Sequence, residues 1–414
     1  MTVEAQSSES TGIIRKCVHC GFCTATCPTY LLLGDELDSP RGRIVLIKEM
    51  LASDAPPAPS TVRHVDRCLS CLGCVTTCPS GVDYMHLIDH AREHIEATYR
   101  RPFGERLLRA LIANVLSHRG IFRFATALAG LGRPLARIFP SRLRAMAAAA
   151  PDRLPPRGTA DRRGVHLAVG TRVARVALLS GCVQPVLAPT IDDAAVRLLT
   201  RHGVEVVIAR VGCCGALPHH LGKTCDARRL AQANIVAWED EIIRGGLDAI
   251  VVTASGCGTT VKDYGHMFAL DPVWQSRATR IAALARDITE VVAAIGLCPP
   301  VITPGKPVAY HSACSMQHGQ RVIDEPRALL AAAGFAVREI GEGHICCGSA
   351  GTYSILQPEL ARRLRDRKLA AISRTGAQIV ATGNIGCITH LAAGGVRMIH
   401  TVELLDWATG GPQP

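Results

Sequence analysis

The sequence predicts a multidomain protein with an all-helical N-terminal module, a helical connector and a duplicated α/β domain. Three observations predict this organisation. Two cysteine runs of identical spacing lie 51 residues apart near the N-terminus, an arginine-rich segment follows them, and the remaining chain contains an internal repeat of strands, helices and cysteines. We therefore place the domains at residues 12–98, 99–172, 173–297 and 298–410 of the 414-residue chain.

Each cysteine run consists of three cysteines at intervals of three residues and a fourth that precedes a proline. The runs are Cys17, Cys20, Cys23 and Cys27, and Cys68, Cys71, Cys74 and Cys78. In two-cluster ferredoxins the fourth cysteine of each run binds the cluster of the other run. The spacing therefore predicts two [4Fe–4S] clusters, with the ligand sets Cys17, Cys20, Cys23 and Cys78, and Cys68, Cys71, Cys74 and Cys27.

Zinc and disulfides are the alternatives for these eight cysteines. Structural zinc sites combine CxxC pairs across a longer loop, and the tightly spaced triplets fit that pattern poorly. Disulfide frameworks are typical of short secreted chains, whereas residues 1–11 are polar and acidic, unlike a secretory signal. Eighteen cysteines in a chain without such a signal predict a reducing compartment, the cytoplasm.

Helices are expected between and after the cysteine runs. Ser39 as a cap and Pro40 in the first turn predict a helix that ends at Leu51, and a second helix is expected at residues 82–99. Helices at these positions, together with the 51-residue offset, favour an all-helical ferredoxin module over the compact β-hairpin type.

The connector carries most of the net charge of +11, because the segment 100–175 has sixteen arginines and three acidic residues. Residues 103–115 and 121–136 are expected to form amphipathic helices. Arginines opposite leucine and phenylalanine suit the surface of an anionic membrane, so we expect peripheral contact with the cytoplasmic face of the inner membrane. The alternative is a docking helix whose arginines are solvated or face the clusters or a partner subunit. An aromatic content of 4% argues against nucleic acid as the partner.

Residues 173–414 contain the same series of elements twice. The strands are expected at 173–180, 204–209 and 249–254 in copy one, and at 308–311, 336–340 and 378–381 in copy two. Strands that alternate with helices predict a parallel sheet, and the loops at the carboxyl ends of such strands converge at one edge. The cysteines in those loops should therefore cluster in each copy.

The second group of cysteines resembles the CCG domain of heterodisulfide-reductase-like proteins. Such a domain can hold an unusual iron–sulfur cluster, with a final CxxC pair supplying two ligands. Here Thr260 and His390 replace the second cysteine of that pair, and histidine is able to ligate iron. The resemblance implies two metal sets, Cys182, Cys213, Cys214 and Cys257, and Cys314, Cys346, Cys347, Cys387 and His390. A structural or redox-active set of thiols is the alternative. Cys225 and Cys298 lie outside both patterns and are expected to be buried.

The whole chain resembles the family of glycolate oxidase iron–sulfur subunits. The resemblance extends from Cys17 to Leu405 and is carried by the segments 181–185, 254–258, 262–265, 346–354 and 384–387. It implies a subunit that relays electrons from FAD-containing partner subunits, which oxidise glycolate to glyoxylate, to an acceptor such as quinone.

No residue is expected to act as a catalytic acid or base. No Gly-x-Gly-x-x-Gly motif follows a strand, and His311, His344 and His400 are expected to be core or ligand-shell residues. Other functions stay open: the matching subunit of an anaerobic glycerol-3-phosphate or lactate dehydrogenase, a heterodisulfide-reductase-like catalytic subunit, and a zinc-bound scaffold.

Overall fold

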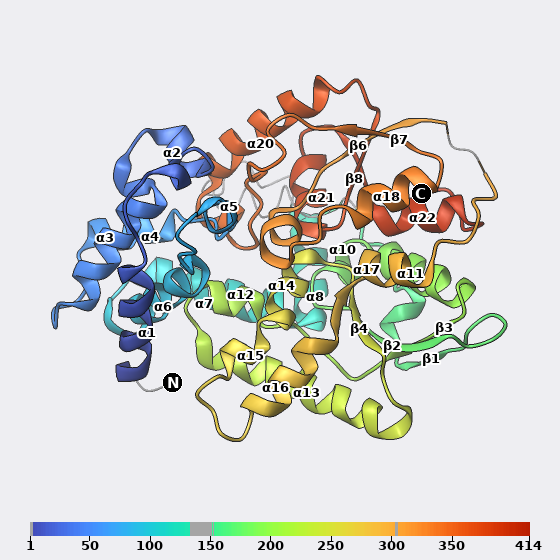
Figure 1. The fold of residues 1–414 in the computed structure, drawn as a ribbon, viewed down its shortest axis with the longest axis horizontal. Coiled ribbons are helices and arrows are strands. Elements are labelled where there is room, and N and C mark those ends of the chain that lie inside the picture. The colour runs from blue at the N-terminus through green and yellow to red at the C-terminus, as the bar shows by residue number, and fades with distance from the viewer. Residues whose placement is uncertain (1–2, 133–150, 152, 303–304) are drawn as a thin grey trace.

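A computed structural model describes residues 3–132, 151, 153–302 and 305–414. The N-terminal helices lie at one side of the two α/β copies, with copy two above copy one in the view of Figure 1. The end of the predicted helix 121–136 falls outside the described residues. None of the described helices has the length and apolar character needed to span a bilayer.

The N-terminal module is built from short helices around one apolar core. Its elements are α1 (Val3–Arg15), η1 (Phe22–Thr24), α2 (Pro28–Leu33), η2 (Glu36–Asp38), α3 (Pro40–Leu51), α4 (Pro59–Asp66), α5 (Gly73–Thr77) and α6 (Tyr84–Thr98). Ser39 caps α3 by accepting a hydrogen bond from the Gly42 amide, and Pro40 is the first helical residue, as predicted. Ile47 of α3 packs with Leu87 of α6 in the core, and both side chains are fully buried.

The connector contains the two expected helices and also a strand. The helices are α7 (Phe103–Ser117) and α8 (Arg119–Gly132), followed by η4 (Thr159–Asp161) and β1 (Gly164–His166). β1 pairs antiparallel with β3 (Val204–Ile208) of copy one, and this strand was not predicted for the connector, which was expected to be helical. A strand of three residues has too weak a sequence signal to be predicted unless the strand with which it pairs is already known.

Some connector arginines hold the N-terminal module together. Arg101 and Arg109 are buried, and both form ion pairs with Asp66 of α4, at 2.6 and 2.9 Å. Arg119 donates to the carbonyl of Gly181 in copy one, at 2.6 Å. These arginines therefore have a structural role within the chain, which neither the membrane contact nor the docking-helix alternative predicted.

Each copy of the repeat forms a largely parallel sheet. Copy one has the strand order β1-β3-β2-β4-β5, with β2 (Ala174–Leu179), β4 (Ala249–Val252) and β5 (Ala285–Asp287). Copy two has the order β7-β6-β8-β9, with β6 (Pro307–Tyr310), β7 (Ala336–Glu339), β8 (Ile379–Thr382) and β9 (Arg397–His400). All pairs except β1–β3 are parallel, which confirms the α/β organisation of the repeat.

The helices of the two copies occupy corresponding places in the chain. Copy one has α10 (Gln184–Leu187), α11 (Pro189–Arg201), α12 (Ala216–His220), α13 (Thr224–Gly245), α14 (Ser255–Lys262), α15 (Tyr264–Met267), α16 (Gln275–Leu284) and α17 (Ile288–Ile295). Copy two has η5 (Ser315–Gln320), α18 (Glu325–Ala332), α19 (Tyr353–Leu356), α20 (Pro358–Ser373), α21 (Ile385–Ala392) and α22 (Thr401–Ala408). Apolar side chains from both copies form one continuous core between the two sheets.

The last helix of each copy begins with the same capping box. Asp287 and Glu290 form it at α17, and His400 and Glu403 form it at α22. His400 also bonds through Nε2 to the Thr253 carbonyl of copy one, at 2.7 Å. This histidine is therefore a core residue that joins the two copies.

The N-terminal module contacts both copies. On the side of copy one, His86 of α6 lies 2.6 Å from Asp83 and 3.0 Å from Asp263. Burial opposes the charge of this imidazole, but hydrogen bonds to both carboxylates raise its pKa to about 10. On the side of copy two, α2 lies against α20, where Arg363 donates to the Leu32 carbonyl at 2.8 Å (Figure 1). The module is thus held against both copies.

Candidate metal centres

Five cysteines line a pocket at the surface side of the N-terminal module, here called the outer pocket. They are Cys17, Cys20 and Cys23 of the first run and Cys74 and Cys78 of the second. The pocket has an empty volume of about 430 Å³, and Cys20 is exposed to solvent. The structure therefore brings together the set that the spacing assigned to the first cluster.

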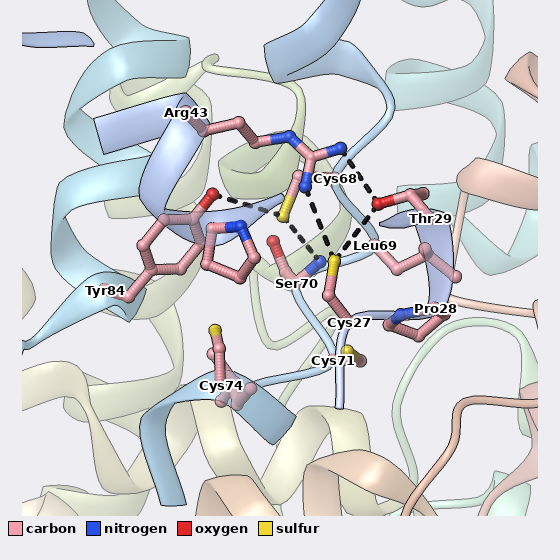
Figure 2. A pocket seen from close by; sticks show the side chains of 12 residues that line it. Cys27, Pro28, Thr29, Arg43, Cys68, Leu69, Ser70, Cys71, Cys74 and Tyr84 are labelled. Carbon is pink, nitrogen blue, oxygen red and sulfur yellow. Dashed lines mark hydrogen bonds between the residues drawn. The ribbon is translucent and has the colours of Figure 1, made fainter. Parts of the chain in front are cut away.

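Four cysteines line a second pocket of about 340 Å³, here called the inner pocket. They are Cys27, Cys68, Cys71 and Cys74, the set that the spacing assigned to the second cluster. Figure 2 shows these cysteines with Arg43 and Tyr84 beside them. Cys74 and Tyr84 also line the outer pocket, so the two pockets are neighbours.

The loops of the two runs share an unusual backbone conformation. His19 and Ser70, at matching positions, have φ values of 54° and 50°, and Gly21 and Leu72 have 89° and 62°. Left-handed conformations at non-glycine residues are strained and are found mainly at functional sites. Alternation with right-handed residues makes a loop concave, which suits a chain that wraps around a bound group.

A buried polar network surrounds Cys27 in the inner pocket. Arg43 is 1% exposed and donates to Thr29 Oγ1 at 3.0 Å and to Asp38 Oδ1 at 3.3 Å. Its Nη1 also approaches Cys27 Sγ at 3.9 Å, and Tyr84 donates to Cys68 Sγ at 4.0 Å (Figure 2). Sequence analysis missed Arg43, because its only signal was an arginine on the apolar face of the predicted helix.

The burial of the cysteines indicates which kind of group fits these pockets. Burial, reinforced by the neighbouring thiolates, raises the pKa of Cys74 well above its usual value, and burial raises the pKa of Cys23 to about 11. Several thiolates in such a space need a cationic group among them. Iron supplies that charge, and thiolate is the usual ligand of [4Fe–4S] clusters, so the eight cysteines fit two clusters.

The cysteines of each repeat copy also gather at the carboxyl ends of the strands. Cys182 and Cys213 sulfurs are 3.5 Å apart in copy one, and Cys347 and Cys387 sulfurs are 3.5 Å apart in copy two. Hydrogen bonds from Cys182 and Cys214 lower the pKa of Cys213 to about 3. In copy two, hydrogen bonds from Cys346 and Cys387 likewise hold the pKa of Cys347 well below its usual value. In each copy the vicinal cysteine pair and its neighbours therefore lie together as one cluster of thiols.

The two residues that replace the final cysteine face backbone carbonyls. Thr260 donates to the Gly256 carbonyl at 3.2 Å, and His390 Nε2 lies 3.2 Å from the Ala361 carbonyl oxygen. His311, in contrast, lies beside Cys347 and Cys387, with all three donor atoms within 4.8 Å of one another. The sequence feature that could have indicated this position of His311 is its place directly after a buried strand.

The predictions for the two cysteines outside both patterns were wrong. Cys225 is exposed and Cys298 is half-buried, although both were expected to be buried. Cys225 lies near the start of α13, where the helix presents it to solvent. Sequence alone did not place these residues because a free cysteine is compatible with either environment.

Comparisons with known proteins agree with this arrangement. Residues 13–82 match the family of the 4Fe-4S dicluster domain, and residues 176–262 and 308–392 both match the family of the cysteine-rich (CCG) domain. The chain is 41% identical over 410 residues to the glycolate oxidase iron-sulfur subunit of Escherichia coli, covering 99% of this chain and 97% of that protein. It is 32% identical to the probable glycolate oxidase iron-sulfur subunit of Bacillus subtilis, covering 96% and 95%. Lactate utilization protein A of Bacillus subtilis is 26% identical over 56% of this chain and 99% of that protein.

Proposed function

Since this chain belongs to the family of glycolate oxidase iron–sulfur subunits, we propose that it relays electrons in a complex whose partner subunits carry FAD and the substrate site. The proposed reaction is the oxidation of glycolate to glyoxylate with an acceptor other than oxygen, such as quinone. The observation that carries this proposal is the pair of neighbouring pockets, which are lined by the eight cysteines of the two runs.

When bound, [4Fe–4S] clusters supply one-electron oxidation and reduction steps. The roles of the chain follow from the positions of its residues. The eight cysteines of the two runs hold the clusters, and Arg43 places a buried positive charge beside Cys27. Exposed Cys20 and Phe22 at the outer pocket support electron exchange with a partner there, whereas the inner pocket lies deeper in the module. A further iron–sulfur cluster in at least one CCG copy belongs to the same proposal.

The test is anaerobic reduction of the chain by substrate through its flavin partner. We expect glycolate to bleach the iron–sulfur absorbance when the FAD subunits are present, and to leave the isolated chain oxidised. Glycolate oxidation by this chain alone would refute the proposal, as would an absorbance that the complete complex with glycolate leaves unchanged.

A second candidate substrate is lactate, and the similarity to lactate utilization proteins favours it. The same experiment separates the candidates, because the physiological substrate should bleach the clusters fastest at equal concentration. Glycerol 3-phosphate serves as the third substrate in the series.

We further propose that α7 and α8 contact the cytoplasmic face of the inner membrane. Phe103 is 70% exposed and Phe124 is 67% exposed, and further exposed apolar side chains continue both helix faces at Leu107, Leu111, Ile121 and Leu128. A row of apolar side chains with Arg106 beside it suits an anionic bilayer surface.

The membrane contact predicts binding of the chain to vesicles that contain phosphatidylglycerol. Replacing both Phe103 and Phe124 by serine should weaken binding at least tenfold, because burial of each ring contributes roughly 1.5–3 kcal/mol. The control is Ile243→Ser, which removes an 83% exposed side chain from α13 in copy one. Equal sedimentation of the double variant and the wild type, or a loss as large in the control, would contradict the contact.

A further inference from the structure

A buried histidine in copy two lies beside two cysteine sulfurs. His311 is 1% exposed, and it follows β6 at the edge of the sheet where the copy-two cysteines gather. A ring nitrogen of His311 and the sulfurs of Cys347 and Cys387 all lie within 4.8 Å of one another. Nε2 of this ring is buried and has no hydrogen-bond partner among the described residues. Such a nitrogen is costly to bury unless another group satisfies it.

The spacing of the sulfurs suits a metal. Cys347 Sγ and Cys387 Sγ are 3.5 Å apart. Two thiolates bound tetrahedrally at about 2.3 Å from one metal ion are separated by roughly 3.8 Å, so a small adjustment accommodates it. Cys346 is adjacent to Cys347 in the chain and contacts Cys314, which brings further thiols to the same place.

Copy one differs at this position. His311 lies three residues before Cys314, and the residue three positions before Cys182 in copy one is Leu179. Leu179 is the last residue of β2 and packs in the apolar core of copy one. Copy one therefore has no imidazole in the corresponding place. In copy two, the ligand atoms of His311, Cys347 and Cys387 all lie within 4.8 Å of one another. Among the described residues, no three cysteine sulfurs of copy one lie that close together.

We propose that copy two, and not copy one, holds an iron centre in which His311 Nε2 is a ligand together with the thiolates of Cys347 and Cys387. This inference rests on the proposed relay function. Cys314 and Cys346 share an apolar cluster with Leu69 and Cys71 of the N-terminal module, so this centre would lie next to the inner pocket. Because imidazole ligands raise the potential of iron–sulfur centres, we expect it to be reduced at a higher potential than the two N-terminal clusters.

The test uses the full chain, isolated anaerobically with its iron, and compares His311→Leu with His390→Leu. Leucine is the residue that copy one carries at the position of His311, and His390 is the matched control because its Nε2 faces the Ala361 carbonyl. In the wild type, pulsed EPR at potentials that leave the N-terminal clusters oxidised should detect strong coupling to a histidine nitrogen. We expect His311→Leu to abolish this coupling and to lower the iron content, and His390→Leu to change neither.

Unchanged coupling and iron content in His311→Leu would overturn the proposal, and so would their loss in His390→Leu or zinc in place of iron in copy two. If His311→Leu does not fold, Cys387→Ala provides the same test. The N-terminal clusters have only cysteine ligands in our assignment, so their signals should persist in both histidine variants. Absence of those signals from the wild type would instead count against the relay function.

Discussion

Cys78→Ala should remove the cluster of the first run, although Cys78 belongs to the second run. Cys78 lines the outer pocket with Cys17, Cys20 and Cys23. The EPR spectrum of this variant after anaerobic reduction should therefore match that of Cys20→Ala, which removes a cysteine found only in the outer pocket. About four irons per chain should be lost, the content of one [4Fe–4S] cluster.

The reverse experiment uses Cys27→Ala, whose spectrum should match that of Cys71→Ala, because both cysteines line only the inner pocket. Cys225→Ala is the control, since Cys225 is exposed and outside both pockets. If Cys78→Ala instead matches Cys71→Ala, each run binds its own cluster and the crossed assignment is wrong.

Arg43→Met should both destabilise the N-terminal module and lower the reduction potential of the inner cluster. The variant leaves the buried Asp38 with fewer partners, and loss of one member of a buried ion pair costs about 3 kcal/mol of unfolding free energy. It also removes the positive charge beside Cys27. The loss of a charged hydrogen bond of this kind, about 1.5–3 kcal/mol, corresponds to a shift of roughly 65–130 mV toward negative potential for a one-electron cluster. Anaerobic urea unfolding and an EPR-monitored redox titration measure the two effects.

Arg41→Met is the matched control on the same helix. Arg41 is partly exposed and pairs with Glu36 at the surface, so its loss should leave the free energy of unfolding nearly unchanged. It does not line the inner pocket, and the potential of that cluster should stay unchanged. An inner-cluster potential that is the same in Arg43→Met and the wild type would show that the buried guanidinium does not tune this cluster.

Features with a strong local pattern could be predicted from the sequence. The cap at Ser39 and the short apolar runs of the repeat predicted the helix and the strands to within a few residues. Both signals are local, because a cap bonds to the next turn and a buried parallel strand is a continuous apolar run in the sequence. The spacing of the cysteine runs also sufficed to group the sulfurs that line each pocket.

Features that depend on tertiary contacts could not be predicted. Arg43 is buried because Asp38, Thr29 and Cys27 converge on it in space, and β1 exists because the edge of β3 is available to it. Likewise, His390 matches the CCG pattern by position, yet His311 is the histidine that the fold places among the sulfurs. In each case the partners of the residue or strand lie elsewhere in the chain, so the contact depends on the tertiary fold and could not be predicted from local sequence.

The central claim is that the eight cysteines of the two runs hold two neighbouring [4Fe–4S] clusters. EPR of the anaerobically reduced full chain, combined with iron and acid-labile sulfide analysis, tests it most directly. We predict two [4Fe–4S] signals that broaden each other through spin interaction, because the pockets share Cys74 and Tyr84. A colourless, zinc-loaded protein without acid-labile sulfide would contradict the account.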